Sequence, residues 1–264
     1  MGRNSHYWDN KTERSKVAKE HNELMKKVKA ENIAQCIKGS KVYNGKDFCD
    51  YSEESESNII KHKVKDEDSV SAVMRLLRTD REKKTAVLNF ASFKNPGGGF
   101  LKGSSAQEES LCHKSTLYPV LEGFDKSFYA YNREHLNKVL YEDRAIYTPD
   151  VYFKTGMYER YCDVITCAAP NLSVAVDLCR LNIADCEEAL EKRAEFIKHI
   201  AEENGVQVLV LGAYGCGVFK WDAKTVAEVF RRVFYKSSCI EKVVHPVPVG
   251  VNKYNYMAFK EVFG

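Results

Sequence analysis

The stretch TAVLNFASFKNPGGGFLKGSSAQEES, residues 85–110, decides the fold class of this 264-residue chain. Its first seven residues, TAVLNFA, form a short apolar run that is typical of a buried strand. Three consecutive glycines follow this strand at positions 97–99, and a seven-residue spacer then leads to Gln107-Glu108-Glu109 at the start of a predicted helix. A buried strand, a glycine-rich loop and a helix in this order indicate an α/β fold.

The same alternation of buried strands and helices continues along the chain. Further apolar runs predict strands at residues 58–64, 161–168, 206–211 and 242–249, and amphipathic patterns predict helices at 66–78, 185–203 and 222–235. These segments predict a mostly parallel sheet with helices on both faces. Ligands of such sheets bind at the carboxyl ends of the strands, where the glycine-rich loops of this chain are expected.

The N-terminal segment is predicted to be helical. Apolar residues recur at helical spacing over the first forty residues, with Thr12 as the expected cap, until Gly39 ends the pattern. A polar, turn-rich stretch with an acidic cluster follows at residues 40–57, where we expect a solvated loop. We therefore expect a single domain over residues 1–264, with residues 1–57 as a helical accessory segment packed on its core.

Composition excludes several classes of protein. The chain has 40 Lys and Arg against 37 Asp and Glu, and this near balance argues against binding nucleic acid or anionic membranes through bulk charge. Nine cysteines without a CxxC pair do not form a secretory disulfide framework, and the N-terminus lacks an apolar signal region. We expect a cytoplasmic protein without a membrane partner.

Histidine and cysteine spacing does not point to a metal. The seven histidines include no HxH or HxxxH pair, so the sequence predicts no metal site, and we expect no cofactor.

Two glycine-rich loops are candidate anion sites. The first covers residues 95–103, and the second, GAYGCGVF, covers residues 212–219 before a predicted helix. Glycine-rich turns present backbone N–H groups to phosphates, although a flexible loop or an ordinary tight turn has the same composition. Neither loop has the GK[ST] ending of a P-loop or the GxGxxG pattern. Together they indicate a nucleotide or pyrophosphate ligand.

The acidic pair after the first loop has two interpretations. Ser105-Ala106-Gln107-Glu108 has the S-x-x-E form of a capping box, which predicts that Glu108 accepts a hydrogen bond from the Ser105 amide. Glu109 is not needed for this cap. It is then either a solvated acid in the first helical turn or a functional carboxylate.

The linked motifs favour the functional interpretation. GGG, seven residues and QEE resemble the signature of the poly(ADP-ribose) glycohydrolases, and NFASFKNPGGGFLKGSSAQEES resembles its microbial form. GAYGCGVFKWD is similar to the diphosphate-binding loop of that family. The resemblance runs from about Arg14 to the C-terminus. It implies a macrodomain-like three-layer sandwich, with a mixed, mostly parallel central sheet and an N-terminal helical extension.

The resemblance also implies roles for individual residues. Glu109 is expected to be the catalytic carboxylate, with Glu108 holding the scissile ribose. Phe219, Tyr214 or Phe259 is expected to lie against the base or a ribose. The implied substrate-binding residues, with Asn95 and Gln107 as contacts or loop-shaping groups, are Asn95, Gly97, Gly98, Gly99, Gln107, Gly215, Cys216, Gly217, Val218 and Phe219.

The implied activity is removal of ADP-ribose from poly(ADP-ribose) at ribose–ribose O-glycosidic bonds. We hypothesise that Glu109, protonated at rest, protonates the leaving oxygen and then takes a proton from the attacking water. The expected partners are ADP-ribose or poly(ADP-ribose) on modified proteins, and nucleic acid enters only as an ADP-ribosylated substrate. The alternatives are a mono-ADP-ribosyl hydrolase acting on modified protein or nucleic acid, and a non-catalytic ADP-ribose-binding macrodomain.

Overall fold

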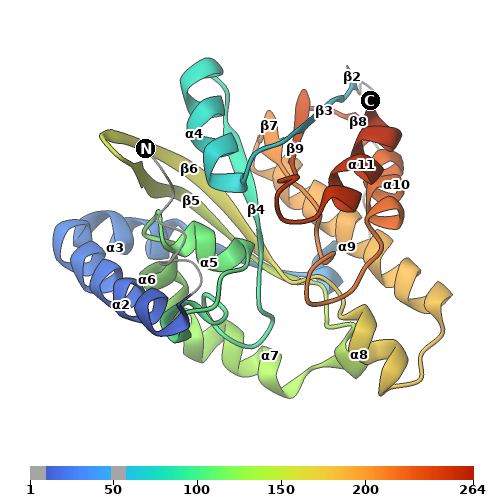
Figure 1. Ribbon diagram of the computed structural model, residues 1–264, viewed down its shortest axis with the longest axis horizontal. Helices are drawn as coiled ribbons and strands as arrows, with labels where there is room; N and C mark the ends of the chain where they lie inside the picture. Colours follow the sequence, from blue (N-terminus) through green and yellow to red (C-terminus); the bar gives the residue numbers. More distant parts are fainter. Residues whose placement is uncertain (1–9, 49–57) are drawn as a thin grey trace.

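The computed structural model describes residues 10–48 and 58–264 and has a seven-stranded central sheet between two helical layers (Figure 1). Four neighbouring pairs in the sheet are parallel, and two pairs at one edge are antiparallel. The predicted macrodomain-like sandwich with a mixed, mostly parallel sheet is therefore confirmed. The strand order is β1 (Lys41–Asn44), β5 (Arg144–Thr155), β6 (Tyr158–Cys167), β4 (Thr85–Phe90), β7 (Val208–Val210), β9 (Lys242–Pro246) and β3 (Lys61–Lys65).

Strand β4 shows why both faces of the sheet carry helices. Ala86 and Leu88 lie in one apolar core and Val87 lies in the other, and all three side chains are fully buried. Successive strand residues point to opposite faces, so an uninterrupted apolar run requires a cover on each side. One cover consists of α2 (Lys11–Val28), α3 (Ala30–Gly39), α4 (Ser69–Thr79), α5 (Gln107–Cys112) and α6 (Leu117–Glu122), and the other consists of α9 (Ile183–Glu203), α10 (Ala223–Val233) and α11 (Lys253–Phe263).

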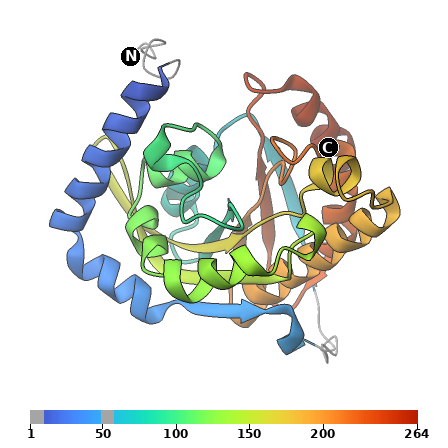
Figure 2. The ribbon, with the colours of Figure 1, turned by 90° about the horizontal axis from the view of Figure 1, so that it is seen from below.

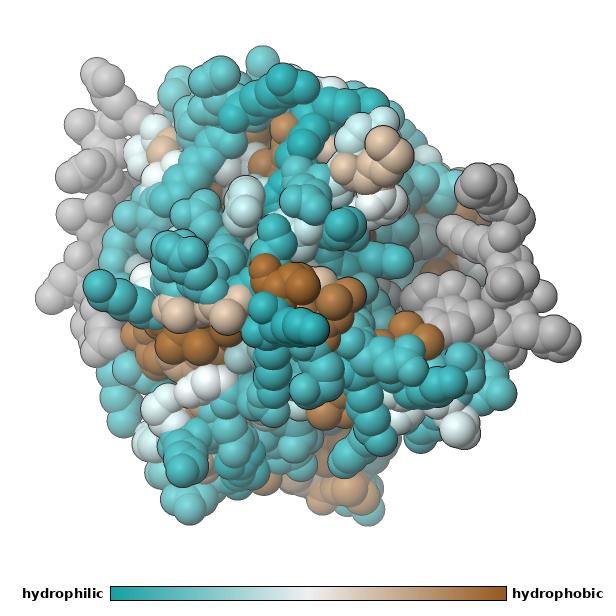
Figure 3. Space-filling view, turned by 90° about the vertical axis from the view of Figure 1, so that its left-hand side faces the viewer, coloured by the Kyte–Doolittle hydropathy of each residue, from teal (hydrophilic) through white to brown (hydrophobic). Residues whose placement is uncertain are grey.

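The N-terminal helical pattern forms two helices. Asn10 caps α2, because its side-chain oxygen accepts hydrogen bonds from the amides of Thr12 and Glu13 at 3.0 and 3.1 Å. The predicted cap, Thr12, is therefore wrong by two residues. The chain leaves the helical conformation at Lys29, with φ −129°, before α3 begins. Helices α2 and α3 run along one side of the molecule (Figure 2), and the face seen from that side is mostly hydrophilic with small hydrophobic patches (Figure 3).

Two strands of the antiparallel edge have no counterpart in the sequence analysis. Strand β1 lies inside the segment expected to be an accessory, yet it pairs with β5 from Lys41↔Tyr147 to Asn44↔Arg144 and completes the sheet. Strand β5 covers residues 144–155, for which the sequence analysis predicts no strand. The acidic cluster at residues 53, 54 and 56 lies outside the described residues.

The remaining elements connect the layers. The helix predicted to begin at Gln107 ends at Cys112, and Pro119 lies inside the first turn of α6. A proline is tolerated there because the amides of a first turn have no helical partner. Helices α7 (Ala130–Glu134) and α8 (Leu172–Asp177) and a short pair of strands, β2 (Asn58–Ile59) and β8 (Lys236–Ser237), complete the fold. Among the helices of residues 10–48 and 58–264, none combines the length and apolar character that a membrane span requires.

Candidate active site

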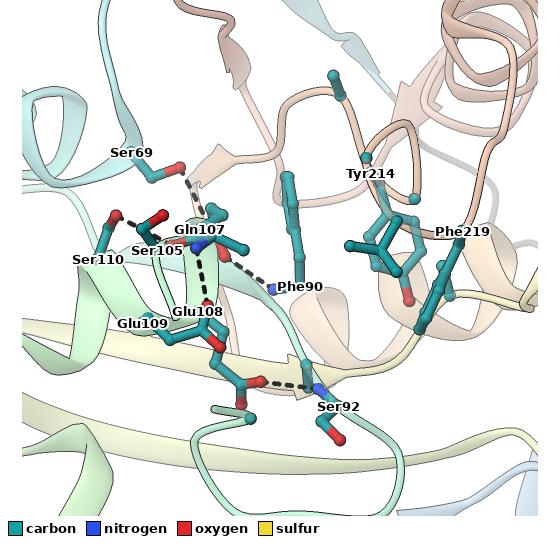
Figure 4. Close-up of a pocket in the computed structure, with 18 of the residues that line it drawn as sticks. Ser69, Phe90, Ser92, Ser105, Gln107, Glu108, Glu109, Ser110, Tyr214 and Phe219 are labelled. Carbon is teal, nitrogen blue, oxygen red and sulfur yellow. Dashed lines mark hydrogen bonds between the residues drawn. The ribbon is translucent and has the colours of Figure 1, made fainter. Parts of the chain in front are cut away.

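A cleft of about 750 Å³ lies at the carboxyl ends of β4, β7 and β9. Both glycine-rich loops and the Gln107-Glu108-Glu109 segment line it, although the second loop is more than a hundred residues from the other two segments in the sequence. Figure 4 shows the acidic segment on one side of the cleft and Tyr214 and Phe219 on the other. Ten of the twelve predicted site residues line this cleft: Asn95, Gly98, Gly99, Gln107, Glu108, Glu109, Gly215, Gly217, Val218 and Phe219.

Glu108 is a buried carboxyl group with a perturbed titration. One carboxyl oxygen accepts a hydrogen bond from Asn89 Nδ2 at 3.2 Å, and the other accepts from the Ser92 amide at 2.8 Å. Burial raises the pKa of Glu108 to about 8, the neighbouring Glu109 charge acts in the same direction, and the two hydrogen bonds oppose the rise. Glu108 therefore holds a proton at neutral pH.

Glu109 is held by backbone amides on both sides. Its Oε1 accepts from the Gly99 amide at 2.8 Å, and its Oε2 accepts from the Ala106 amide at 2.9 Å. Ala106 is the N-cap of α5, so Glu109 occupies the third helical position and makes the reciprocal capping bond. The predicted capping bond from Glu108 to Ser105 is wrong, because the helix begins one residue later than the S-x-x-E pattern suggests.

Gln107 anchors the acidic pair to the sheet. Its Oε1 accepts from the Phe90 amide at 2.9 Å, and its Nε2 donates to the Leu88 carbonyl at 2.9 Å and to Ser69 Oγ at 3.1 Å. The side-chain amide thereby continues the hydrogen bonding of β4 at the end of that strand and also reaches the start of α4. Both donors and the acceptor of Gln107 are used within the protein, so this residue shapes the site.

Gly98 lies directly against both carboxyl groups. It has φ +59°, and a Cβ at this position would lie 2.7 Å from Glu109 Oε1 and 2.8 Å from Glu108 Oε2. Only glycine allows such a close approach of backbone to the two acids. Gly97 faces the protein instead, since its Cβ would lie 2.5 Å from the Tyr118 ring, and it is one of the two predicted residues that do not line the cleft.

The second glycine-rich loop forms the opposite wall. Gly217 lines the cleft with open space around its missing side chain, which leaves the backbone accessible to a ligand. Val218 also lines the cleft and is 78% exposed. Cys216 is the other predicted residue outside the lining, because it packs against the core and its Sγ donates to the Tyr214 carbonyl at 3.6 Å.

Three aromatic residues were candidates for contact with a base or ribose. Phe219 and Tyr214 line the cleft, whereas Phe259 is fully buried against His245 and does not. Phe90, which the sequence analysis missed, also lines the cleft and contacts Tyr214 edge to face at 5.5 Å between ring centroids. Its position as the last residue of a buried strand is the signal that could have identified it.

Helix α2 supports the loop that carries the glycines. Arg14 Nε donates to the Gly103 carbonyl at 2.7 Å, and Ser15 Oγ donates to the Leu101 carbonyl at 2.6 Å. Gly103 packs so closely on this helix that a Cβ would lie 2.0 Å from the Lys11 carbonyl oxygen. The N-terminal helices therefore hold the loop beside the acidic pair. Within the described ranges, His, Cys, Asp and Glu form no cluster of three or more that could hold a metal ion.

Comparisons with known proteins show which family and which solved structures this chain is similar to. Residues 10–155 match the family model for the catalytic domain of the microbial-type poly(ADP-ribose) glycohydrolase (PARG). No curated protein sequence matches the chain. Similar solved structures include the Thermomonospora curvata PARG bound to the inhibitor ADP-HPD, which is 29% identical with a TM-score of 0.82 and covers 94% of this chain and 98% of that one.

Two further solved structures extend the comparison. Another Thermomonospora curvata PARG structure is 28% identical, with a TM-score of 0.84 over 95% of this chain and 99% of that chain. The Deinococcus radiodurans PARG in complex with ADP-ribose is 30% identical, with a TM-score of 0.77 over 87% of this chain and 96% of that chain. On the shared fold and the family match, this chain belongs to the microbial-type poly(ADP-ribose) glycohydrolase family.

Proposed function

We propose that this protein hydrolyses the ribose–ribose O-glycosidic bonds of poly(ADP-ribose) and releases ADP-ribose, with Glu109 as the general acid and base. The observation that carries the proposal is the buried pair Glu108–Glu109, which is held against the backbone of Gly98 and opens into the cleft. Related structures of this family contain ADP-ribose or the inhibitor ADP-HPD, which supports an ADP-ribose unit as the occupant of the cleft.

The pair supplies the proton that bond cleavage needs. In this proposal the proton comes from Glu108, whose pKa burial raises to about 8, and reaches the leaving oxygen through the adjacent Glu109. As the bond from the ribose C1″ to the leaving oxygen breaks, Glu109 transfers this proton to that oxygen. A water molecule then adds its hydroxyl to the oxocarbenium-like carbon and gives its proton to Glu109, which restores the pair.

The glycine-rich loops account for the binding of an anionic substrate by a nearly neutral protein. Loop 212–219 lies across the cleft from the acidic pair, and none of its residues carries a charged side chain. Oriented backbone amides stabilise phosphate charge without a basic patch. We propose that this loop holds the pyrophosphate of the bound ADP-ribose unit.

The catalytic unit, in this proposal, is a single macrodomain-type domain. The family match covers residues 10–155, but the second glycine-rich loop and strands β7 and β9 lie beyond it and complete the cleft. The substrate is poly(ADP-ribose) attached to modified proteins. The N-terminal helices belong to this unit because α2 supports the loop beside Glu109.

A substitution of Glu109 tests the assignment. We expect Glu109→Gln to lower kcat for ADP-ribose release from poly(ADP-ribose) by about 10²- to 10⁴-fold, the usual contribution of a general acid–base group. The exposed Glu20 on α2 provides a control, since Glu20→Gln makes the same chemical change far from the cleft lining. Full turnover by Glu109→Gln would contradict the mechanism.

The wild-type protein tests the two alternatives. Release of ADP-ribose only from singly modified proteins or nucleic acid would favour a mono-ADP-ribosyl hydrolase. Tight binding of ADP-ribose without any release from the polymer would favour a non-catalytic binding macrodomain.

A further inference from the structure

Two lysines that flank the three glycines of the first glycine-rich loop line the cleft, and neither takes part in the proposed mechanism. Lys94 precedes the three glycines and Lys102 follows them. Among the described residues that line the cleft, these two are the only ones with a cationic side chain, and the acids there are Asp68, Glu108 and Glu109. The positive charge of the cleft wall is therefore concentrated on the loop beside the reacting carboxyl groups.

The backbones of both lysines are fixed, but their side chains are uncommitted. Arg133, itself paired with Asp125, donates to the Lys94 carbonyl at 3.0 Å. The Lys102 amide donates to the Gly99 carbonyl at 2.9 Å, and α2 holds the carbonyls on either side of Lys102. Both side chains are exposed, and neither has an ion-pair partner within 4.0 Å among residues 10–48 and 58–264. A fixed backbone together with an ammonium group that has no ion-pair partner favours binding of an external anion.

The position of the lysines separates them from the pyrophosphate of the bound unit. The proposed function assigns that pyrophosphate to loop 212–219 on the opposite wall of the cleft. The lysines instead lie on the loop that carries Gly98 and Gly99, which contact the acids at the scissile bond. The acids act at the bond between the bound unit and the leaving unit, so in this proposal the two lysines lie at the junction of the two units.

The leaving side differs in charge between the candidate substrates. In a polymer, the leaving oxygen belongs to another ADP-ribose unit, which carries its own pyrophosphate. In a singly modified protein, the leaving group is an amino-acid side chain without a phosphate. We propose that Lys94 and Lys102 bind the pyrophosphate of the leaving ADP-ribose unit and so make the enzyme specific for polymer. This inference rests on the proposed function.

A double substitution separates the leaving-side site from the site of the bound unit. We expect Lys94→Gln/Lys102→Gln to lower kcat/KM on poly(ADP-ribose) about tenfold, mainly through KM, which corresponds to ~1.4 kcal/mol for two exposed ionic contacts. The Kd for free ADP-ribose, measured by calorimetry, is expected to stay within twofold because ADP-ribose alone fills only the other half of the site. Lys94→Arg/Lys102→Arg is expected to restore kcat/KM.

A matched control removes the same charge elsewhere. Lys61 and Lys63 on the edge strand β3 are exposed and outside the cleft lining, so Lys61→Gln/Lys63→Gln is expected to leave kcat/KM unchanged. An equal loss in the control would mean a bulk-charge effect and would overturn the proposal. An unchanged kcat/KM in the Lys94→Gln/Lys102→Gln variant would also overturn the proposal. The same holds if this variant binds free ADP-ribose as much more weakly as its kcat/KM on polymer falls. If the wild-type protein releases no ADP-ribose from polymer, the proposed function itself fails and the leaving-side site fails with it.

Discussion

Replacing Gly98 by alanine should disable the acidic pair without removing either acid. The new methyl group would lie 2.7 Å from Glu109 Oε1 and 2.8 Å from Glu108 Oε2, closer than side-chain carbons lie to such oxygens in proteins. Gly156, in the turn between β5 and β6, is a matched control because it has the same φ of +59° and nothing within 4 Å of its Cβ position. Both variants carry the same backbone strain, about 1–2 kcal/mol for an L-residue in the left-handed region.

The difference between the two variants measures the contact with the carboxyl groups. To reach ordinary contact distance, the side chains of Glu108 and Glu109 must move by several tenths of an ångström, which disturbs their bonds to the Ser92 and Gly99 amides. A hydrogen bond within a protein contributes about 0.5–1.5 kcal/mol net, so with two bonds disturbed we expect Gly98→Ala to lose ~2 kcal/mol more unfolding free energy than Gly156→Ala. Misplacing a catalytic group costs about 10²-fold in rate, so kcat should fall by that factor in Gly98→Ala alone.

Urea unfolding and ADP-ribose release from poly(ADP-ribose) provide the two measurements. A kcat for Gly98→Ala within twofold of that for Gly156→Ala would refute the placement of the acids against the Gly98 backbone. Equal losses of unfolding free energy in both variants would refute the steric argument even if activity fell.

Two further predictions concern stability. Burial raises the pKa of Glu108 to about 8, so the folded protein holds a proton that the unfolded chain releases above its ordinary pKa of 4.5. The stabilisation that Glu108 contributes is therefore fully present below about pH 4.5 and is lost as the pH rises to about 8. Between these pH values, the unfolding free energy of Glu108→Gln should fall less than that of wild type. Parallel pH profiles of the two proteins in urea unfolding would contradict the assignment. Gly103→Ala should lower the unfolding free energy by about 2–4 kcal/mol and also lower kcat, because its Cβ would lie 2.0 Å from the Lys11 carbonyl and push α2 off the loop. Urea unfolding checks this, and a loss no larger than that of Gly156→Ala would contradict the close packing of α2.

Several features that the sequence mispredicts have identifiable physical causes. Strand β1 was missed because its four residues are too few for a periodic signal, and β5 was missed because Pro149 and Asp150 interrupt its apolar run at a register shift. The cap of α5 was placed one residue early because Ala106, which has no capping side chain, precedes the first helical residue. Gly97 and Cys216 were grouped with their neighbours in the two loops, although each faces the protein interior.

The sequence by itself determined the buried strand, the Gly97–Gly99 loop and the acidic pair at their spacing, and through them the α/β class and the family. These features are local, since apolar runs, glycines and acidic residues express their preferences within a few positions of the chain. The tertiary structure alone decided which groups meet. It brought loop 212–219 across the cleft from Glu109, placed Gly98 against both acids and buried Glu108 so that it holds a proton. Contact and burial depend on segments far apart in the sequence, and for that reason they required the fold.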